Sequence, residues 1–337
     1  MKRRLLYISI VFVVSIFVTA GYSLLVLGQV WWGQSLLSGI LTVVAIAGYE
    51  LLLRLRFQQP DREAPAESDS VAAPIPEGNF STSEPPRLPD EVYARFEEAG
   101  VRVEMISIDL TAYRAFIERA EYEVRHPKYI EGFGAVFAEK SLEHFLSLQI
   151  LAIEPQDVYL DVAAANSPLP AIVERLTGCR AYRQDLFYSA GMHGRTIGGD
   201  AGQLPLADAF ADKIALHCSL EHFEGDADSH FIQEAARVLK PGGRLCIIPL
   251  YMSSRYFILT DPDTWAERRP HFDRDALIVK RQGWQNSFGR NYDVPHFLTR
   301  IRDYAVDLDL TIIRILDAHK VDPICYLRFV AVFDKPA

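Results

Sequence analysis

The chain has 337 residues, of which 49% are hydrophobic, so it is long enough for one large domain or two smaller ones. Its formal net charge of −9 argues against a nucleic-acid-binding surface, because phosphate contacts need clustered Lys and Arg and no basic run exceeds Lys2-Arg3-Arg4. The cysteines Cys179, Cys218, Cys246 and Cys325 are widely spaced, which favours buried reduced thiols over a disulfide framework or a zinc motif.

Two apolar segments begin the chain. Residues 5–28 contain no charged side chain and residues 36–53 contain only Glu50, while about 20 apolar residues suffice to cross a bilayer. Trp31 and Trp32 lie between the two segments and suit a membrane interface. We therefore expect a two-helix transmembrane hairpin over residues 1–57.

Basic residues flank this hairpin on both sides. Lys2-Arg3-Arg4 precede the first segment, and Arg54 and Arg56 follow the second, so the positive-inside rule predicts a multi-pass membrane protein with the remaining chain in the cytoplasm. The alternative is a signal peptide cleaved after Val18-Thr19-Ala20. The hairpin is favoured because the apolar run continues past Ala20.

Residues 58–89 are rich in Pro, Glu, Asp, Ser and Ala, a composition that predicts a disordered linker. A folded domain is expected over residues 90–337, and helical periodicity is expected in its first part, 90–154. The apolar stripe Phe137, Leu142, Phe145, Leu146 and Ile150 indicates core packing. The alternative interpretation of this segment is that Tyr129, Phe133 and Lys140 contact a ligand.

Alternating strands and helices then predict an α/β fold: a doubly wound, Rossmann-like, seven-stranded and mainly parallel sheet. Strands are expected at 157–162, 179–184, 195–199, 212–218 and 243–250, and helices at 168–177 and 226–240. A further helix near DVPHFLTRIRDYAVDLDL precedes two strands, LTIIRIL and CYLRFVAVF, which are expected to pair antiparallel at the sheet edge.

Polar residues follow the first predicted strand. Asn166 or Ser167 can cap a helix and Pro168 suits its first position, so a helix N-terminus would face the strand's carboxyl end and offer a site for a nucleotide-like ligand. Asp161, Asp185 and Asp200 lie at or just past three strand ends, which share one edge of such a sheet. The three carboxylates are expected to surround one crevice, with Asp185 near the spacing of a ribose-binding residue.

Two segments carry a family resemblance: GGDAGQLPLADAFADKIALHCSLEHF at 198–223 and FIQEAARVLKPGGRLCIIPLY at 231–251. Across roughly 150–334 the chain resembles the class I S-adenosylmethionine-dependent methyltransferases (type 11-like). That family has an acidic residue and Leu-Pro after the third strand, a Leu-x-His-type turn after the fourth, and a helix ending in Leu-x-Pro-Gly-Gly.

The resemblance implies S-adenosylmethionine as the cofactor. By position, Asp161 and the turn after it would receive the methionine part, Asp185 the ribose, and Asp200 with the Ala201 backbone the adenine. His217, Cys218 and Ser219 would border the transferring methyl. The full set of implied cofactor-binding residues is Asp161, Ala163, Ala165, Asn166, Asp185, Asp200, Ala201, His217, Cys218 and Ser219.

The first turn departs from the family, because alanines and a serine replace the glycines of Asp/Glu-x-Gly-x-Gly-x-Gly. Small side chains preserve a close approach to the ligand, but a positive φ becomes costly. Should the acceptor be a hydroxyl, a base must take its proton, and His222, His217 and Glu221 are the nearest candidates. His222 is alternatively a capping or packing residue.

Acceptor recognition is expected in the long insertion 251–293, whose arginines suit a phosphate or carboxylate. The alternative for this insertion is a folded flap with solvated arginines. The main interpretation is a membrane-tethered methyltransferase acting on a small molecule, a lipid-linked glycan or another envelope component.

Two other interpretations remain open. One is a catalytically inactive, membrane-anchored scaffold, which the missing glycines favour. The other, a nicotinamide dehydrogenase, is weaker because its fingerprint also needs a glycine-rich turn. No catalytic metal is indicated, since no His, Asp or Glu cluster has ligand spacing.

Overall fold

The computed structural model of the chain describes residues 80–81 and 83–337. The expected transmembrane hairpin at 1–57, and the linker up to residue 79, lie outside the described residues. Within the described part, no helix combines the length and apolar character that a membrane span needs. The described residues belong to one compact unit.

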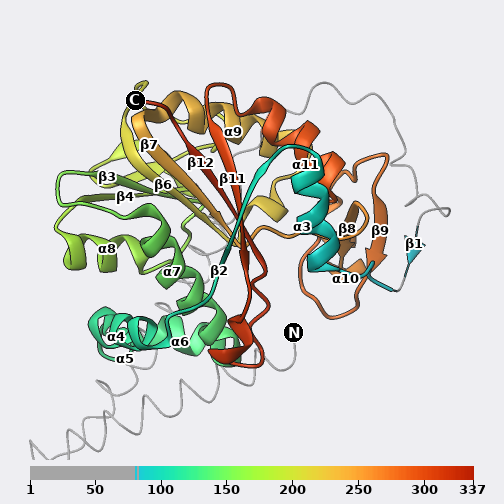
Figure 1. Cartoon of the computed structure of the whole chain (residues 1–337), viewed down its shortest axis with the longest axis horizontal. Coiled ribbons are helices and arrows are strands. Elements are labelled where there is room, and N and C mark those ends of the chain that lie inside the picture. The colour runs from blue at the N-terminus through green and yellow to red at the C-terminus, as the bar shows by residue number, and fades with distance from the viewer. Residues whose placement is uncertain (1–79, 82) are drawn as a thin grey trace, which may run out of the picture. The chain divides into compact units, whose positions relative to one another are not determined.

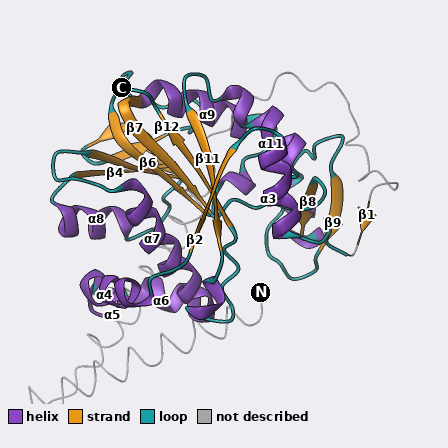
Figure 2. Cartoon of the chain, in the orientation of Figure 1, coloured by secondary structure: helices purple, strands orange, loops and turns teal. Residues whose placement is uncertain are grey.

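An eight-stranded sheet forms the centre of this unit, in the order β2-β11-β12-β7-β6-β3-β4-β5 (Figures 1 and 2). Its neighbouring strands run parallel, except that β12 is antiparallel to both β11 and β7. Its strands are β2 (Arg102–Ile106), β3 (Val158–Val162), β4 (Arg180–His193), β5 (Thr196–Gly198), β6 (Ala211–His217), β7 (Leu239–Ile248), β11 (Asp309–Ile315) and β12 (Phe329–Asp334). The prediction of a Rossmann-like, mostly parallel α/β sheet is confirmed.

The predicted number of seven strands is wrong. The additional strand, β2, lies within the segment expected to be helical and pairs in parallel with β11. Its sequence, RVEMI, has only five residues between helical patterns, and its register with β11 supplies the hydrogen bonds that stabilise it. Long-range pairing therefore determines a conformation that the local pattern does not indicate.

Helices cover both faces of the large sheet. α7 (Phe137–Leu151) and α8 (Leu169–Thr177) pack on one face, and α9 (Ala227–Val238) packs on the other (Figure 1). Along β3, the side chain of Tyr159 joins the apolar layer under α7 and α8, whereas those of Leu160 and Val162 join the layer under α9, as alternation along a buried strand requires.

The remaining helices are α3 (Pro89–Glu98), α4 (Leu110–Ala120), α5 (Tyr122–Arg125), α6 (Pro127–Phe133), α10 (Pro262–Arg268) and α11 (Val294–Arg300), with 3-10 turns η1 (Gly134–Val136), η2 (Leu220–His222), η3 (Arg302–Tyr304) and η4 (Ala318–Lys320).

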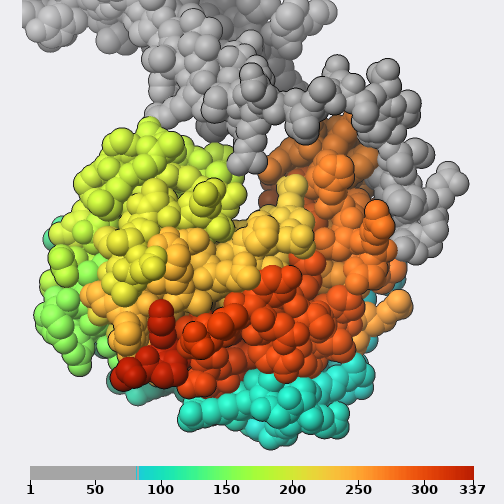
Figure 3. Space-filling view, turned by 90° about the horizontal axis from the view of Figure 1, so that it is seen from above, coloured from blue at the N-terminus to red at the C-terminus, as the bar shows by residue number. Residues whose placement is uncertain are grey.

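The insertion at 251–293 builds a second, smaller sheet in the order β1-β9-β8-β10. Its strands are β1 (Phe80–Ser81), β8 (Phe257–Thr260), β9 (Leu277–Lys280) and β10 (Gly289–Asn291). In the space-filling view the insertion, in orange, lies beside the red-orange C-terminal part of the chain (Figure 3). Because β1 belongs to this sheet, the folded part begins within the segment assigned to the linker.

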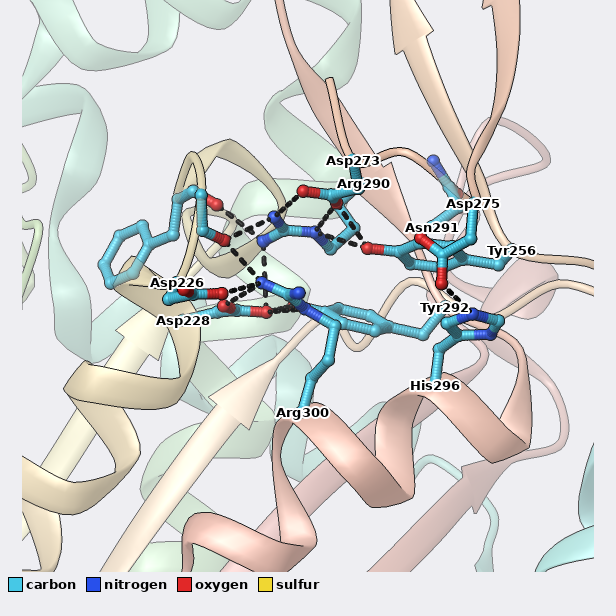
Figure 4. Close-up of polar contacts among 12 residues, drawn as sticks. Asp226, Asp228, Tyr256, Asp273, Asp275, Arg290, Asn291, Tyr292, His296 and Arg300 are labelled. Carbon is cyan, nitrogen blue, oxygen red and sulfur yellow. Dashed lines mark hydrogen bonds and ion pairs between the residues drawn. The ribbon is translucent and has the colours of Figure 1, made fainter. Parts of the chain in front are cut away.

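A buried guanidinium attaches the insertion to the large sheet. Arg290 in β10 is fully buried and pairs with Asp273 at 2.9 Å and with Asp228 of α9 at 3.0 Å (Figure 4). It also donates to the carbonyls of Phe223 and Gly225, which precede α9. This arginine is therefore committed to joining the two sheets and is not available to an acceptor.

Candidate active site

A cleft of about 830 Å³ opens at the carboxyl ends of β3 and β6. Cavities of this size are typical of small-molecule and cofactor sites. Four segments line it: α6, α7, the turn after β3 and the turn after β6. Its lining residues are Lys128, Tyr129, Gly132, Phe133, Lys140, Glu143, His144, Asp161, Ala163, Ala164, Ala165, Asn166, Ser167, His217, Cys218, Ser219 and His222.

The turn after β3 reaches positive φ without glycine. Ala163 has φ 53° and Ala165 has φ 41°, a region that L-residues rarely occupy. Gln184 accepts a hydrogen bond from the Ala163 N–H at 3.2 Å, and Asp185 accepts one from the Ala165 N–H at 2.7 Å. Side chains of β4 thus hold a backbone conformation that glycine would adopt freely.

Helix α8 begins one residue later than expected. Pro168 precedes the helix as its N-cap residue, and the Ser167 hydroxyl accepts a hydrogen bond from the Leu169 N–H at 3.2 Å. Ser167, one of the two residues proposed to cap, therefore supplies the side-chain contact. Asn166 lines the cleft.

Asp161 and His217 form a hydrogen-bonded pair at the cleft. Asp161 Oδ1 lies 3.0 Å from His217 Nδ1, and His217 Nε2 lies 2.9 Å from the Ser147 hydroxyl. The second oxygen of the carboxylate, Oδ2, is buried without a hydrogen-bond partner. Because both ring nitrogens of His217 are engaged, this histidine orients Asp161. Oδ2 can accept a hydrogen bond from a ligand, and the buried Tyr159 hydroxyl, which also lacks a partner, is the competing donor within the protein.

The other two candidate bases differ in position. His222 lies at the cleft, stacks on Trp284 with ring centroids 6.1 Å apart, and donates from Nδ1 to the Phe288 carbonyl at 2.7 Å. Because a carbonyl only accepts, Nδ1 carries a proton, and Nε2 lies 3.7 Å from Glu221 Oε1. Glu221 is buried outside the cleft lining, and its Oε2 has no hydrogen-bond partner.

The residues expected at the ribose and adenine lie outside this cleft lining. Asp185 is buried, and its Oδ1 accepts a hydrogen bond from the Phe187 N–H at 3.0 Å, in addition to the bond from Ala165. Asp200 is exposed and accepts one from the Gly202 N–H at 2.8 Å, whereas Ala201 is buried. The cleft therefore unites the residues assigned to the methionine end but not those assigned to the nucleoside.

Helix α7 contributes polar residues to the cleft, and among them only Lys140 was named from the sequence as a possible ligand contact. Lys140 Nζ donates to Glu143 Oε1 at 2.8 Å, and both side chains are buried. Burial raises the pKa of Glu143 to about 8, although the nearby Lys140 ammonium opposes the shift. Burial lowers the pKa of His144, which hydrogen-bonds through Nδ1 to the Tyr122 hydroxyl at 2.6 Å.

Cys218 and two tyrosines extend this polar group. Cys218 has φ 48°, and its Sγ lies 3.3 Å from the Tyr251 hydroxyl. Tyr251 in turn donates to the Tyr326 hydroxyl at 3.3 Å, and Lys140 Nζ lies 3.4 Å from that same hydroxyl. Burial raises the pKa of the Cys218 thiol, so this sulfur is a neutral packing group.

Residues 131–247 match a protein family described as a methyltransferase domain. The chain carries a methyltransferase domain. The matched range runs from α6 to β7 and includes most of the cleft lining. S-adenosylmethionine is the cofactor of this methyltransferase domain.

Solved methyltransferases share a distant likeness with the chain. The Burkholderia thailandensis 1,6-didemethyltoxoflavin-N1-methyltransferase, bound to S-adenosylhomocysteine, has 14% identity and a TM-score of 0.36, covering 66% of this chain and 89% of its own. The Streptomyces coelicolor geranyl diphosphate C-methyltransferase has 13% identity and a TM-score of 0.37, covering 59% and 81%. Such low TM-scores carry no inference about substrate. No curated protein matches the chain.

The residues of the methyltransferase domain fit the methionine end of this cofactor. Asp161 Oδ2 is a buried acceptor without a partner in the cleft wall, and a ligand ammonium would satisfy it. The turn after β3 presents only small side chains, so the backbone can approach a ligand closely.

Proposed function

We propose that the chain is a membrane-anchored methyltransferase that acts on a small-molecule, lipid-linked or other envelope acceptor from the cytoplasmic side. The two uncharged or nearly uncharged segments at 5–28 and 36–53 support the anchor. Lys2-Arg3-Arg4, Arg54 and Arg56 support a cytoplasmic domain.

Within this proposal Asp161 holds the methionine end of the cofactor, together with the backbone of Ala163, Ala165 and Asn166. The partnerless Asp161 Oδ2 is the single observation that carries this assignment. His217 keeps the Asp161 carboxylate oriented through the 3.0 Å bond, and Ser147 fixes the far side of the imidazole.

The nucleoside end of the cofactor is assigned to the neighbouring strand ends. Asp185 accepts hydrogen bonds from the ribose, and Asp200 with Ala201 borders the adenine. Each oxygen of the Asp185 carboxylate has a further lone pair beside its backbone bond, so ribose hydroxyls can add to the existing contacts.

The bound cofactor supplies a methyl group on a positively charged sulfur. The protein then has to hold donor and acceptor in line and exclude water, which is the main source of catalysis in a single displacement. His217, Cys218 and Ser219 border the place of transfer. The rings of Tyr129 and Phe133 line the same cleft and exclude water.

Transfer of a labelled methyl group tests this function. Membranes from cells that express the full chain are incubated with S-adenosylmethionine carrying a tritiated methyl group, and extracted lipids, glycans and small molecules are counted. We expect label in one acceptor fraction, with a strong reduction for Asp161→Asn. Label equal to that of control membranes, with the chain shown to be present, would contradict the proposed activity.

Fractionation and protease accessibility test the anchor separately. We expect the chain in the membrane pellet after an alkaline wash. In right-side-out vesicles the domain over residues 90–337 should be protected from added protease. Recovery of the intact chain in the soluble fraction would rule out the anchor while leaving the methyl-transfer result unaffected.

A further inference from the structure

Helix α7 buries an unusual number of ionisable side chains beside the cleft. Glu139, Lys140, Glu143 and His144 are each no more than 6% exposed. Charged side chains are rarely buried unless they are paired or meet a ligand. Those of Lys140, Glu143 and His144 line the cleft, whereas Glu139 does not.

Glu143 has one oxygen that the protein leaves unused. Its Oε1 accepts the 2.8 Å hydrogen bond from Lys140 Nζ, whereas its Oε2 is buried without a partner. A buried acceptor without a donor costs free energy that a bound ligand can recover. Glu143 therefore offers a ligand one strong acceptor oxygen, beside an ammonium that already neutralises its charge.

Two aromatic rings lie on the same cleft. The centroids of Tyr129 and Phe133 are 4.8 Å apart, and Phe133 is 39% exposed. Lys140 Nζ lies 5.9 Å from the Phe133 ring centroid, so the aromatic wall adjoins the Lys140–Glu143 pair. A flat ring packs well on such a wall, and its polar substituent would then reach the pair.

On the basis of the proposed methyl transfer, we propose that Glu143 and Lys140 form the acceptor subsite for an aromatic hydroxyl compound, with Glu143 Oε2 as the base that takes the hydroxyl proton. The ring of the acceptor packs on Tyr129 and Phe133. The acceptor oxygen forms a bond to the methyl carbon as the sulfur–methyl bond breaks with its electron pair on sulfur. The hydroxyl proton passes to Glu143, and the products are the aryl methyl ether and S-adenosylhomocysteine.

The chemistry of the pair suits this step. Burial raises the pKa of Glu143 to about 8, closer to the value of about 10 for a phenol, and a base is most effective when the two values approach each other. Lys140 stays protonated and can stabilise negative charge that develops on the oxygen. The ionisable groups around Glu143 are Lys140 and Glu139 of α7, Glu221 and Cys218 after β6, and Tyr129, Tyr251 and Tyr326.

The test compares two probes that differ only in the hydroxyl hydrogen. Binding of 4-fluorophenol and 4-fluoroanisole to the full chain, saturated with S-adenosylhomocysteine, is followed by fluorine NMR at a pH above 8, where the Glu143 carboxylate is ionised. We expect 4-fluorophenol to bind on the order of tenfold more tightly, because only it can donate to Glu143 Oε2. Equal affinities, or binding of neither probe, would overturn the subsite.

Two variants and one control separate this role from a structural one. Lys140→Met/Glu143→Leu removes both charges together and so leaves no unpaired buried ion. Glu143→Gln keeps the shape of the side chain. We expect the double variant and Glu143→Gln to lose the preference for 4-fluorophenol. The control Glu139→Gln, on the same helix but outside the cleft lining, should keep this preference. A preference that survives in both Glu143 variants refutes the assignment.

Calorimetric titration of the same samples with S-adenosylhomocysteine distinguishes a failure of the proposed function from a failure of the acceptor subsite. A folded chain that does not bind S-adenosylhomocysteine contradicts the proposed function itself. Cofactor binding without a preference for 4-fluorophenol contradicts the subsite alone.

Discussion

Asp185, in β4, accepts a hydrogen bond at 2.7 Å from the backbone N–H of Ala165, in the turn after β3. Asp185 lies on β4, and Ala165 lies on the loop that follows β3, the parallel neighbour of β4 in the large sheet. The contact fixes a turn in which Ala163 and Ala165 both have positive φ. It replaces, through a side chain, part of what glycine would provide through conformational freedom.

Replacing Ala165 with glycine should stabilise the protein. Ala165→Gly removes the side-chain clash at φ 41° at the cost of a more flexible unfolded chain, so we expect the free energy of unfolding to rise by roughly 0.5–1 kcal/mol. Urea denaturation measures this change in the free energy of unfolding. Ala164→Gly, at the adjacent residue without positive φ, is the matched control and should lower stability; stabilisation by both or by neither would contradict the role assigned to φ.

Loss of the Arg290 guanidinium should be strongly destabilising. Arg290→Met removes the arginine partner of Asp273 and one of the two arginine partners of Asp228, which keeps Arg300 at 2.7 Å (Figure 4). Breaking a buried pair typically costs about 3–5 kcal/mol. Urea denaturation again provides the measurement. Arg268→Ala, at an exposed position of the same insertion, should change stability by no more than about 0.5 kcal/mol. A similarly small effect at Arg290 would show that the network does not join the two sheets.

Glu143 should titrate far above an ordinary glutamate. Carboxyl-carbon NMR of glutamate-labelled protein is expected to show one signal that titrates near pH 8 and is missing in Glu143→Gln. Lys140→Met should move this titration to higher pH, because the ammonium lowers the pKa of Glu143. Titration of every glutamate near 4.5 would contradict the burial of this carboxyl group.

The same shift has a consequence for stability. The pKa of Glu143 in the folded state exceeds the ordinary value of 4.5. Between pH 4.5 and about pH 8 the folded state therefore keeps a proton that the unfolded state has already released. Glu143 therefore contributes stability below pH 4.5 that is lost as the pH rises through about 8. The decline of unfolding free energy over this range should be smaller in Glu143→Gln.

The sequence predicts the part of the fold that follows local pattern. The strands β3 and β6 and the helices α8 and α9 were expected near their observed positions because apolar runs and helix-end signals mark them. β4 extends to His193, beyond the predicted end at 184, and β7 begins at Leu239, so that Gly242-Gly243 lie within the strand. The antiparallel pair β11 and β12 was also expected. By contrast, β2 and the second sheet depend on pairing between short strands distant in sequence, which local periodicity does not reveal.

The candidate site was predicted only in part. Asp161, His217 and the alanine-rich turn were expected and do line one cleft, because the parallel strands bring their carboxyl ends together. Glu143 was missed because its helix reads as an apolar core stripe. The overlooked signal is the run Glu139-Lys140 and Glu143-His144 within that stripe, where ionisable residues occupy positions that the helix buries.

Calorimetric titration of the full chain with S-adenosylmethionine tests the central claim most directly, with Asp161→Asn as the variant and Asp212→Asn as its control. Asp212 lies at the opposite end of the sheet, where it accepts a hydrogen bond from the Val158 N–H. We predict one site with a dissociation constant between about 1 μM and 1 mM, weakened at least tenfold in Asp161→Asn and unchanged in the control. Absence of binding by the folded wild-type chain, or equal binding by Asp161→Asn, would contradict the cofactor site described here.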